Sequence, residues 1–114
     1  MLRMATLLFA TGAVGGIILA TRHLQNKGAP IPLALLHGLL VASGLTVLAI
    51  AVRQMTPAGL AGVALVIYLV AALGGFVLFA LHLQKKYLPP ALIILHAFVA
   101  VSATVVLLTA QIKG

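Results

Sequence analysis

The four histidines are the residues of this chain whose type and spacing could support chemistry. They form two pairs, His23 with His37 and His82 with His96, and the partners in each pair are 14 residues apart. Neutral imidazole is the commonest metal ligand among side chains, and ionisable groups in a membrane chain usually face the interior of the helix bundle. The repeated pair therefore predicts paired imidazole ligands inside a membrane protein.

A tandem repeat carries both histidine pairs. When the sequence is displaced by 59 positions, the Gly-Gly pair at 15–16 aligns with the pair at 74–75, and the two histidine pairs align with each other. Across residues 15–51, 15 of 37 positions are identical in the second copy. The chain is therefore predicted to contain a duplicated unit that keeps its histidines.

The composition indicates that the solvent around this protein is lipid. Hydrophobic residues make up 64% of the chain, charged residues 6%, and the mean hydropathy is +1.31. A membrane helix needs about 20 mostly apolar residues, and continuous apolar runs of that length fit helices. Four stretches without Lys or Arg are long enough, namely 4–21, 28–52, 54–84 and 87–112. We expect an all-α membrane protein of four transmembrane helices.

The turns between these stretches predict how the helices are connected. Short turns imply antiparallel neighbours, and hence an up-down-up-down bundle made from a tandem repeat of a two-helix hairpin. Proline favours the first position of a helix, which places helix starts at Pro32, Pro57 and Pro89 or Pro90. The expected helices are about 5–25, 32–53, 57–84 and 90–110. They form one domain, 1–114, with repeat 1 at about 1–55 and repeat 2 at about 56–114.

Both repeats are expected to enter the membrane from the same side, because each crosses it twice. All four histidines then lie toward one face, about 4–9 Å below the turns at 1.5 Å per residue. That side carries four cations, Arg22, Lys27, Lys85 and Lys86, and the other side carries three, Arg3, Arg53 and Lys113. The excess predicts that the histidine side faces the cytoplasm. We expect a multi-pass protein of a bacterial inner membrane.

Missing residue types exclude several functions. The chain has no Cys, which excludes thiolate iron–sulfur clusters and covalently attached haem. It has no Asp or Glu, so it cannot form a carboxylate relay of an ion-coupled transporter. The net charge of +7 is spread over the span ends, which argues against nucleic-acid binding. Ser43, Ser102, Thr11 and Thr109 lie away from the level of the histidines and form no nucleophile–base arrangement with them, so no hydrolytic or transferase site is expected.

Small residues lie deeper in the membrane than the histidines. Gly16, Gly75 and Gly44 are each seven residues from a histidine, an offset that shares its helix face. A porphyrin gripped near one membrane face would need small residues where its flat ring extends inward. We interpret the three glycines as ring-packing positions, although helix packing through small residues needs no cofactor. The propionates would pair with cations at the turns, Arg22, Lys27, Lys85 and Lys86, which could instead bind lipid headgroups.

The ligands could be paired in more than one way. A single haem b on the bundle axis would take His23 with His82, or His37 with His96. Two haems would take His23 with His37 and His82 with His96, which the repeat favours because each unit then holds a complete ligand pair.

The chain resembles the small membrane b-type cytochromes, in the cytochrome b561-like group, where paired histidines on neighbouring helices clamp haem. The resemblance covers residues 15–51 and 74–110 and depends on the four histidines with their nearby glycines. It implies electron transfer, with haem b as cofactor and a quinone or redox subunits as partners. The b561-like pattern places haems toward both membrane faces, whereas all histidines here lie toward one, which does not fit transfer across the membrane.

Two functions of different classes therefore remain open. The first is a membrane electron-transfer protein that binds haem b, alone or as a subunit of a larger redox complex. The second is a cofactor-free accessory subunit or oligomer whose apolar faces pack against a partner within the lipid bilayer. A zinc or copper site made of four imidazoles is a third alternative.

Overall fold

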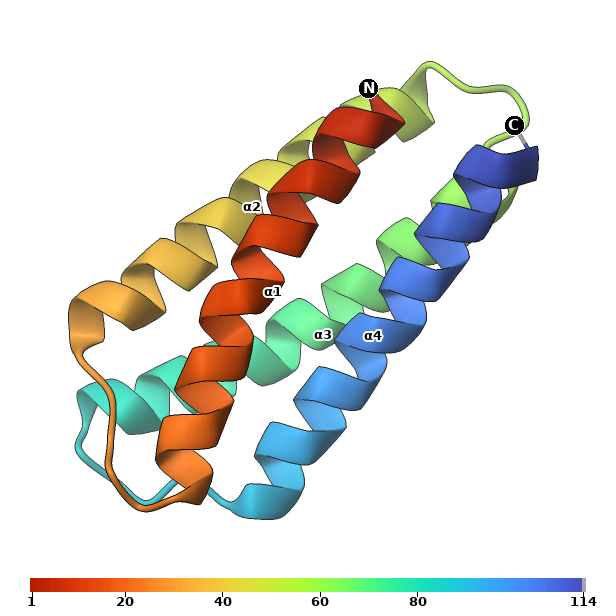
Figure 1. The fold of residues 1–114 in the computed structure, drawn as a ribbon. Coiled ribbons are helices and arrows are strands. Elements are labelled where there is room, and N and C mark those ends of the chain that lie inside the picture. The colour runs from red at the N-terminus through yellow and green to blue at the C-terminus, as the bar shows by residue number, and fades with distance from the viewer. Residues whose placement is uncertain (114) are drawn as a thin grey trace.

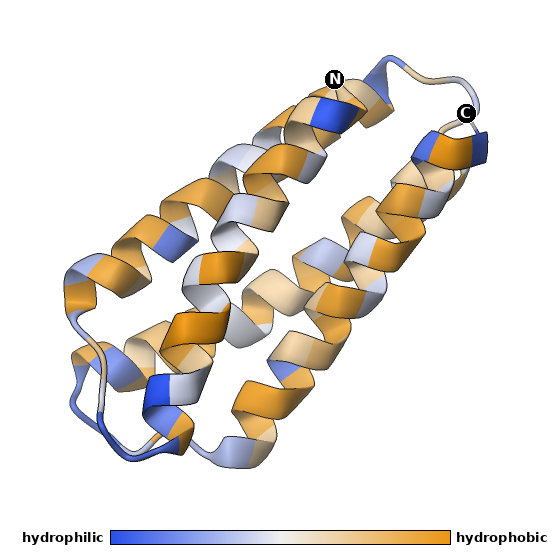
Figure 2. Ribbon diagram, viewed as in Figure 1, coloured by the Kyte–Doolittle hydropathy of each residue, from blue (hydrophilic) through white to orange (hydrophobic). Residues whose placement is uncertain are grey.

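The computed structural model describes residues 1–113 and consists of four antiparallel helices (Figure 1). They are α1 (Leu2–Leu24), α2 (Ile31–Arg53), α3 (Gly59–Leu83) and α4 (Pro90–Lys113). Each is long and apolar enough to cross a membrane, and hydrophilic residues gather at the ends and loops (Figure 2). The predicted all-α bundle of four transmembrane helices is confirmed. Gly114, the last residue of the expected domain, lies outside the described residues.

The helix boundaries differ from the predicted ones by a few residues. Two prolines act as expected, because Pro32 lies in the first turn of α2 and Pro90 begins α4. Pro57 does not start a helix, and α3 begins two residues later. Gly59 has a φ of +55°, a value that glycine adopts without steric cost. The chain therefore turns at Gly59 before the helix can propagate.

The bundle is built from two hairpins, α1–α2 and α3–α4. Each helix packs against two neighbours around a ring, with α2 against α3 and α1 against α4 closing it. Packing is far more extensive within a hairpin than between hairpins. The duplicated sequence unit is thus also the structural unit, and the interface between the two copies is the weaker one.

The shared core lies in the half of the bundle that contains the two chain termini. Its centre is a stack of Phe9 on Tyr68, with ring centroids 3.8 Å apart and planes 6° from parallel. These residues occupy equivalent positions in the two repeats, so the pseudo-twofold axis passes between the two rings. A Cβ on Gly44 would stand 3.1 Å from the Phe9 ring, and the Tyr68 hydroxyl lies 2.7 Å from Thr104 Oγ1. The buried cluster consists of Ala5, Phe9, Leu48, Ala64, Tyr68, Ala103 and Leu107.

The opposite half of the bundle, near the loops 25–30 and 84–89, has almost no buried core. Among residues 13–37 and 72–96, Ile93 alone is buried. Helices in lipid associate through close packing rather than a hydrophobic driving force. The two hairpins are therefore fastened together at the terminal end and only loosely joined at the histidine end.

Two glycines of α2 provide a matched test of this core. We expect Gly44→Ala to destabilise the bundle by about 1–3 kcal/mol, because its methyl group would press on the Phe9 ring. Gly38→Ala should be neutral or stabilise by up to about 1 kcal/mol, since a Cβ there meets no atom within 4 Å. Thermal unfolding in detergent, followed by circular dichroism, measures both. Equal melting temperatures for the two variants would contradict the described packing.

Candidate functional site

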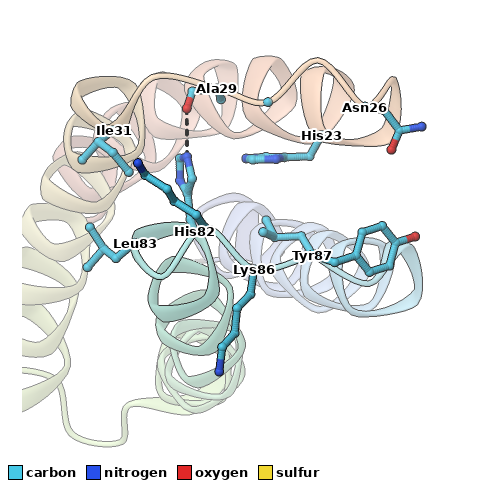
Figure 3. A pocket seen from close by; sticks show the side chains of 11 residues that line it. His23, Asn26, Ala29, Ile31, His82, Leu83, Lys86 and Tyr87 are labelled. Carbon is cyan, nitrogen blue, oxygen red and sulfur yellow. Dashed lines mark hydrogen bonds between the residues drawn. The ribbon is translucent and has the colours of Figure 1, made fainter.

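The histidines form two tiers, and the outer tier lies at the ends of α1 and α3. The rings of His23 and His82 meet edge to face, with centroids 4.9 Å apart and planes at 88°. His82 also donates a hydrogen bond from Nε2 to the carbonyl oxygen of Ala29, at 2.8 Å (Figure 3). This bond joins the end of repeat 2's first helix to the loop of repeat 1. The Nε2 atom of His82 is therefore already committed to a partner.

The inner tier consists of His37 and His96, each held against the preceding helix of its own hairpin. His37 Nδ1 lies 2.7 Å from the carbonyl oxygen of Gly12, and His96 Nδ1 lies 2.8 Å from that of Ala71. A carbonyl can only accept, so each Nδ1 carries the proton and Nε2 of the neutral ring keeps a lone pair. Within residues 1–113, neither Nε2 atom has a hydrogen-bond partner.

The glycine pairs explain how the imidazoles reach these carbonyls. A carbonyl oxygen inside a helix has a second lone pair besides the one used by the helix. A Cβ on Gly16 would stand 2.9 Å from His37 Cε1, and one on Gly75 would stand 3.1 Å from His96 Cε1. A side chain at either position would push the ring off its acceptor. Gly16 and Gly75 were predicted to pack against a porphyrin, and in the structure they lie against the imidazoles of His37 and His96, while Gly44 contacts Phe9.

The two tiers lie at different depths. His23 is one residue from the end of α1, whereas His37 is six residues into α2. The His37 ring contacts Gly16, which precedes His23 by seven residues, or about 10 Å along a helix. The separation between the tiers is therefore larger than the few ångströms expected from depths of about 4–9 Å below the turns. The reason is that the first turn of α2 comes before His37, while nothing comparable separates His23 from the loop.

The tiers do not form a conventional metal-ion site. In the part of the chain that the structure describes, no group of three or more His, Cys, Asp or Glu side chains could hold a metal ion. Structural zinc sites use four protein ligands, and catalytic ones use three. The arrangement therefore gives no support to a zinc or copper site made of four imidazoles. The histidines occur only in pairs, and two imidazoles suit a metal whose remaining ligands belong to a cofactor.

A cleft of about 430 Å³ opens between the two loops beside the outer tier. Of the four cations that the sequence singled out, Lys85 and Lys86 line it. Arg22 instead contacts the first loop, where its Nε donates to the carbonyl oxygen of Gly28 at 2.7 Å. Lys27 is exposed on the same loop. Since the chain contains no acidic side chain, the potential at this end of the bundle is positive.

The residues that shape the loops were partly missed by sequence reasoning. Asn26 and Lys85 occupy equivalent positions after α1 and α3, and both have a positive φ, 59° and 57°. This conformation lets the N–H of the next residue donate to a carbonyl oxygen in the last turn of the helix, as in common helix C-caps. The asparagine could have predicted this conformation, because Asn adopts a positive φ more readily than most residues. The carbonyl acceptors at Gly12, Ala71 and Ala29 had no signal, because every residue carries the same backbone group.

Comparison of the chain with protein-family models, curated proteins and solved structures finds no match. The function must therefore be inferred from the two tiers of imidazoles, the carbonyls that hold them and the cleft beside them.

Adjacent glycines in α1 test the inner tier. Gly16→Ala should displace the His37 ring and weaken its bond to Gly12, which we expect to destabilise the bundle by about 1–3 kcal/mol. Gly15→Ala is the control, since its Cβ would lie 3.5 Å from His37 Cβ, an ordinary contact. The ¹⁵N chemical shifts of the His37 ring report the hydrogen bond directly. Unchanged shifts in Gly16→Ala would rule out the described contact.

Proposed function

We propose that this protein binds haem b through His37 and His96 and carries electrons within the membrane. One observation supports this choice of ligands: each Nδ1 donates to a backbone carbonyl, which leaves each Nε2 with a free lone pair. Metal-ligating histidines almost always donate their other ring N–H in this way, which fixes the tautomer and the ring orientation. The chain has no carboxylate for that purpose, so carbonyl oxygens take the role.

The symmetry of the two hairpins supports a shared cofactor. The bonds from His37 to Gly12 and from His96 to Ala71 each span 25 residues and are related by the repeat. Two equivalent imidazoles, one from each hairpin, could together hold the iron of a single haem. When bound, haem b would supply reversible one-electron chemistry, with a potential tuned by its ligands and surroundings. Two protein ligands on the iron would leave little room there for a substrate, which favours electron transfer over catalysis.

The packing leaves scope for a flat ring between the hairpins. The histidine half holds a single buried residue, Ile93, so a cofactor there would not displace the Phe9–Tyr68 core. Gly16 and Gly75 keep the backbone beside the imidazoles free of side chains. The propionates would extend toward the loops, where charge-assisted pairing is favourable. The candidate partners there are Arg22, Lys27, Lys85 and Lys86.

The other ligand pairings are less favourable in this geometry. Between His23 and His82 the rings are in edge-to-face contact at 4.9 Å, which leaves no gap for a macrocycle. Pairing within a hairpin would have to span the difference of about 10 Å in depth between His23 and the His37 ring. We therefore favour one haem on the inner tier over two haems, one per repeat.

The placement and partners of the protein belong to the same proposal. The four structural helices make it a multi-pass integral membrane protein. We infer that the histidine end lies in the cytoplasm, because that end has four of the seven cations, and we propose a bacterial inner membrane as its location. A quinone in the bilayer or a redox subunit of a larger complex would then exchange electrons with the haem.

A cofactor-free accessory role is the second candidate, and one observation favours it. Within residues 1–113, every buried side-chain nitrogen or oxygen already has a hydrogen-bond partner. His37, His82 and His96 each join two segments of the chain, so they could be present for packing alone. In that function the lipid-facing surfaces of the spans would bind a partner subunit.

Glutamine variants separate ligation from packing. In His37→Gln or His96→Gln the side-chain amide can still donate to the carbonyl but cannot act as an imidazole ligand. We expect at least about a tenfold loss of haem affinity in each, by analogy with the 10–100-fold effects of weaker perturbations at metal sites. His23→Gln and His82→Gln should retain the haem. Pyridine haemochrome assays and low-spin electron paramagnetic resonance spectra measure the outcome.

The same assay decides between the two candidate functions. A wild-type chain that takes up no haem, together with a fourfold glutamine variant that keeps its melting temperature and partner binding, would establish the accessory role instead. If only the His23→Gln and His82→Gln variants lost haem, the ligands would have to be assigned to His23 and His82 instead.

A further inference from the structure

The cleft between the two loops is lined in part by polar groups that can donate hydrogen bonds to a ligand. They are His23, Asn26, Lys85, Lys86 and Tyr87. His82 also lines the cleft, but its Nε2 already donates to the carbonyl oxygen of Ala29. The chain has no Asp or Glu, so none of its own side chains can neutralise the two ammonium groups. Oppositely charged ligands favour such a positive, partly enclosed surface. The chemistry of the lining therefore indicates an anionic ligand.

The cleft is also amphipathic along its length (Figure 3). At one end Ile31, at the start of α2, and Leu83, at the end of α3, lie opposite each other. At the other end Asn26 and Tyr87 extend toward the outside, with the imidazoles between the two ends. The apolar end therefore lies where two membrane spans begin and end, next to the hydrocarbon. A ligand that fills the cleft would need an apolar part there and a charged part at the loops.

The position and size of the cleft suit a lipid. The loops connect the ends of membrane spans, which places them at the level of the headgroups. A volume of about 430 Å³ lies within the range of about 300–1,000 Å³ that is typical of small-molecule sites. Clusters of Lys and Arg at a membrane surface attract anionic lipids.

We propose that this cleft binds one anionic phospholipid, with its phosphate beside Lys85 and Lys86 and its acyl chains leaving past Ile31 and Leu83. Lys86 extends away from His82 in Figure 3, so its ammonium group would rotate toward the phosphate, as a flexible lysine stem permits. This site does not use the inner histidines. With Lys85 and Lys86 at the phosphate, Arg22 and Lys27 remain for the two propionates of a haem.

A tryptophan reporter tests the site, because the chain has no tryptophan of its own. Tyr87→Trp places the reporter in the cleft, and Ile112→Trp, at a side chain that is 86% exposed near the opposite membrane face, is the control. Each variant is reconstituted in phosphatidylcholine vesicles that contain a fixed fraction of brominated phosphatidylglycerol or brominated phosphatidylcholine. We expect brominated phosphatidylglycerol to quench Trp emission more strongly at position 87, and both lipids to quench equally at position 112.

Charge variants in the Tyr87→Trp background identify the residues responsible. Lys85→Gln with Lys86→Gln should lower the apparent affinity for phosphatidylglycerol by about fivefold per lysine. Arg53→Gln with Lys113→Gln, on the opposite face, should leave it unchanged. An equal loss in both pairs would overturn the proposal, since the preference would then reflect overall charge. If the lysine pair does not fold, the comparison of positions 87 and 112 decides alone.

Soluble anions distinguish the source of the phosphate. Inorganic phosphate and glycerol 1-phosphate are added to the same vesicles at constant ionic strength, and neither should abolish the preference for phosphatidylglycerol. Complete displacement by either one would assign the cleft to a soluble phosphate and refute a lipid site. The haem absorbance of every sample is recorded, so a failure of haem binding and a failure of lipid selection are distinguished.

Discussion

The hydrogen bonds from the inner histidines to helix carbonyls are the interactions on which the rest of this structure depends. In a bilayer no water can satisfy a polar group, so an imidazole must find its partner within the protein. His37 and His96 do so by using Gly12 and Ala71 of the preceding helix. The bonds join the two helices of each hairpin and fix the ring tautomer, and each Nε2 atom has no hydrogen-bond partner within residues 1–113.

The uneven distribution of packing along the bundle complements these bonds. At the terminal end, the Phe9–Tyr68 stack and its buried neighbours join the two hairpins around their symmetry axis. At the histidine end, close contacts occur mainly within each hairpin, and the space between hairpins is bounded by imidazoles and loops. A bundle closed at one end and loosely packed at the other can keep its fold while the open end accepts a ligand. The buried core and the histidines are thus located in different halves of the bundle.

The two repeats are not identical at their loops, and the difference bears on the outer tier. His82 reaches the carbonyl of Ala29, whereas no corresponding bond of His23 is found within residues 1–113. The second loop has Tyr87 where the first has Gly28, and two lysines where the first has Asn26 and Lys27. Duplication therefore preserved the inner imidazoles and their geometry, while the loops diverged to form a single asymmetric cleft.

The sequence alone determined the four spans, the hairpin repeat and the grouping of the histidines at one end, because hydropathy, prolines and repeat spacing are properties of the chain. It also singled out Gly16 and Gly75, although as positions that would pack against a porphyrin and not against imidazoles. The two depths of the histidines, the partners of each imidazole and the contact of Gly44 with Phe9 were decided by tertiary structure. Backbone carbonyls are the same at every residue, so only the packing of one helix against another determines which carbonyl a side chain reaches.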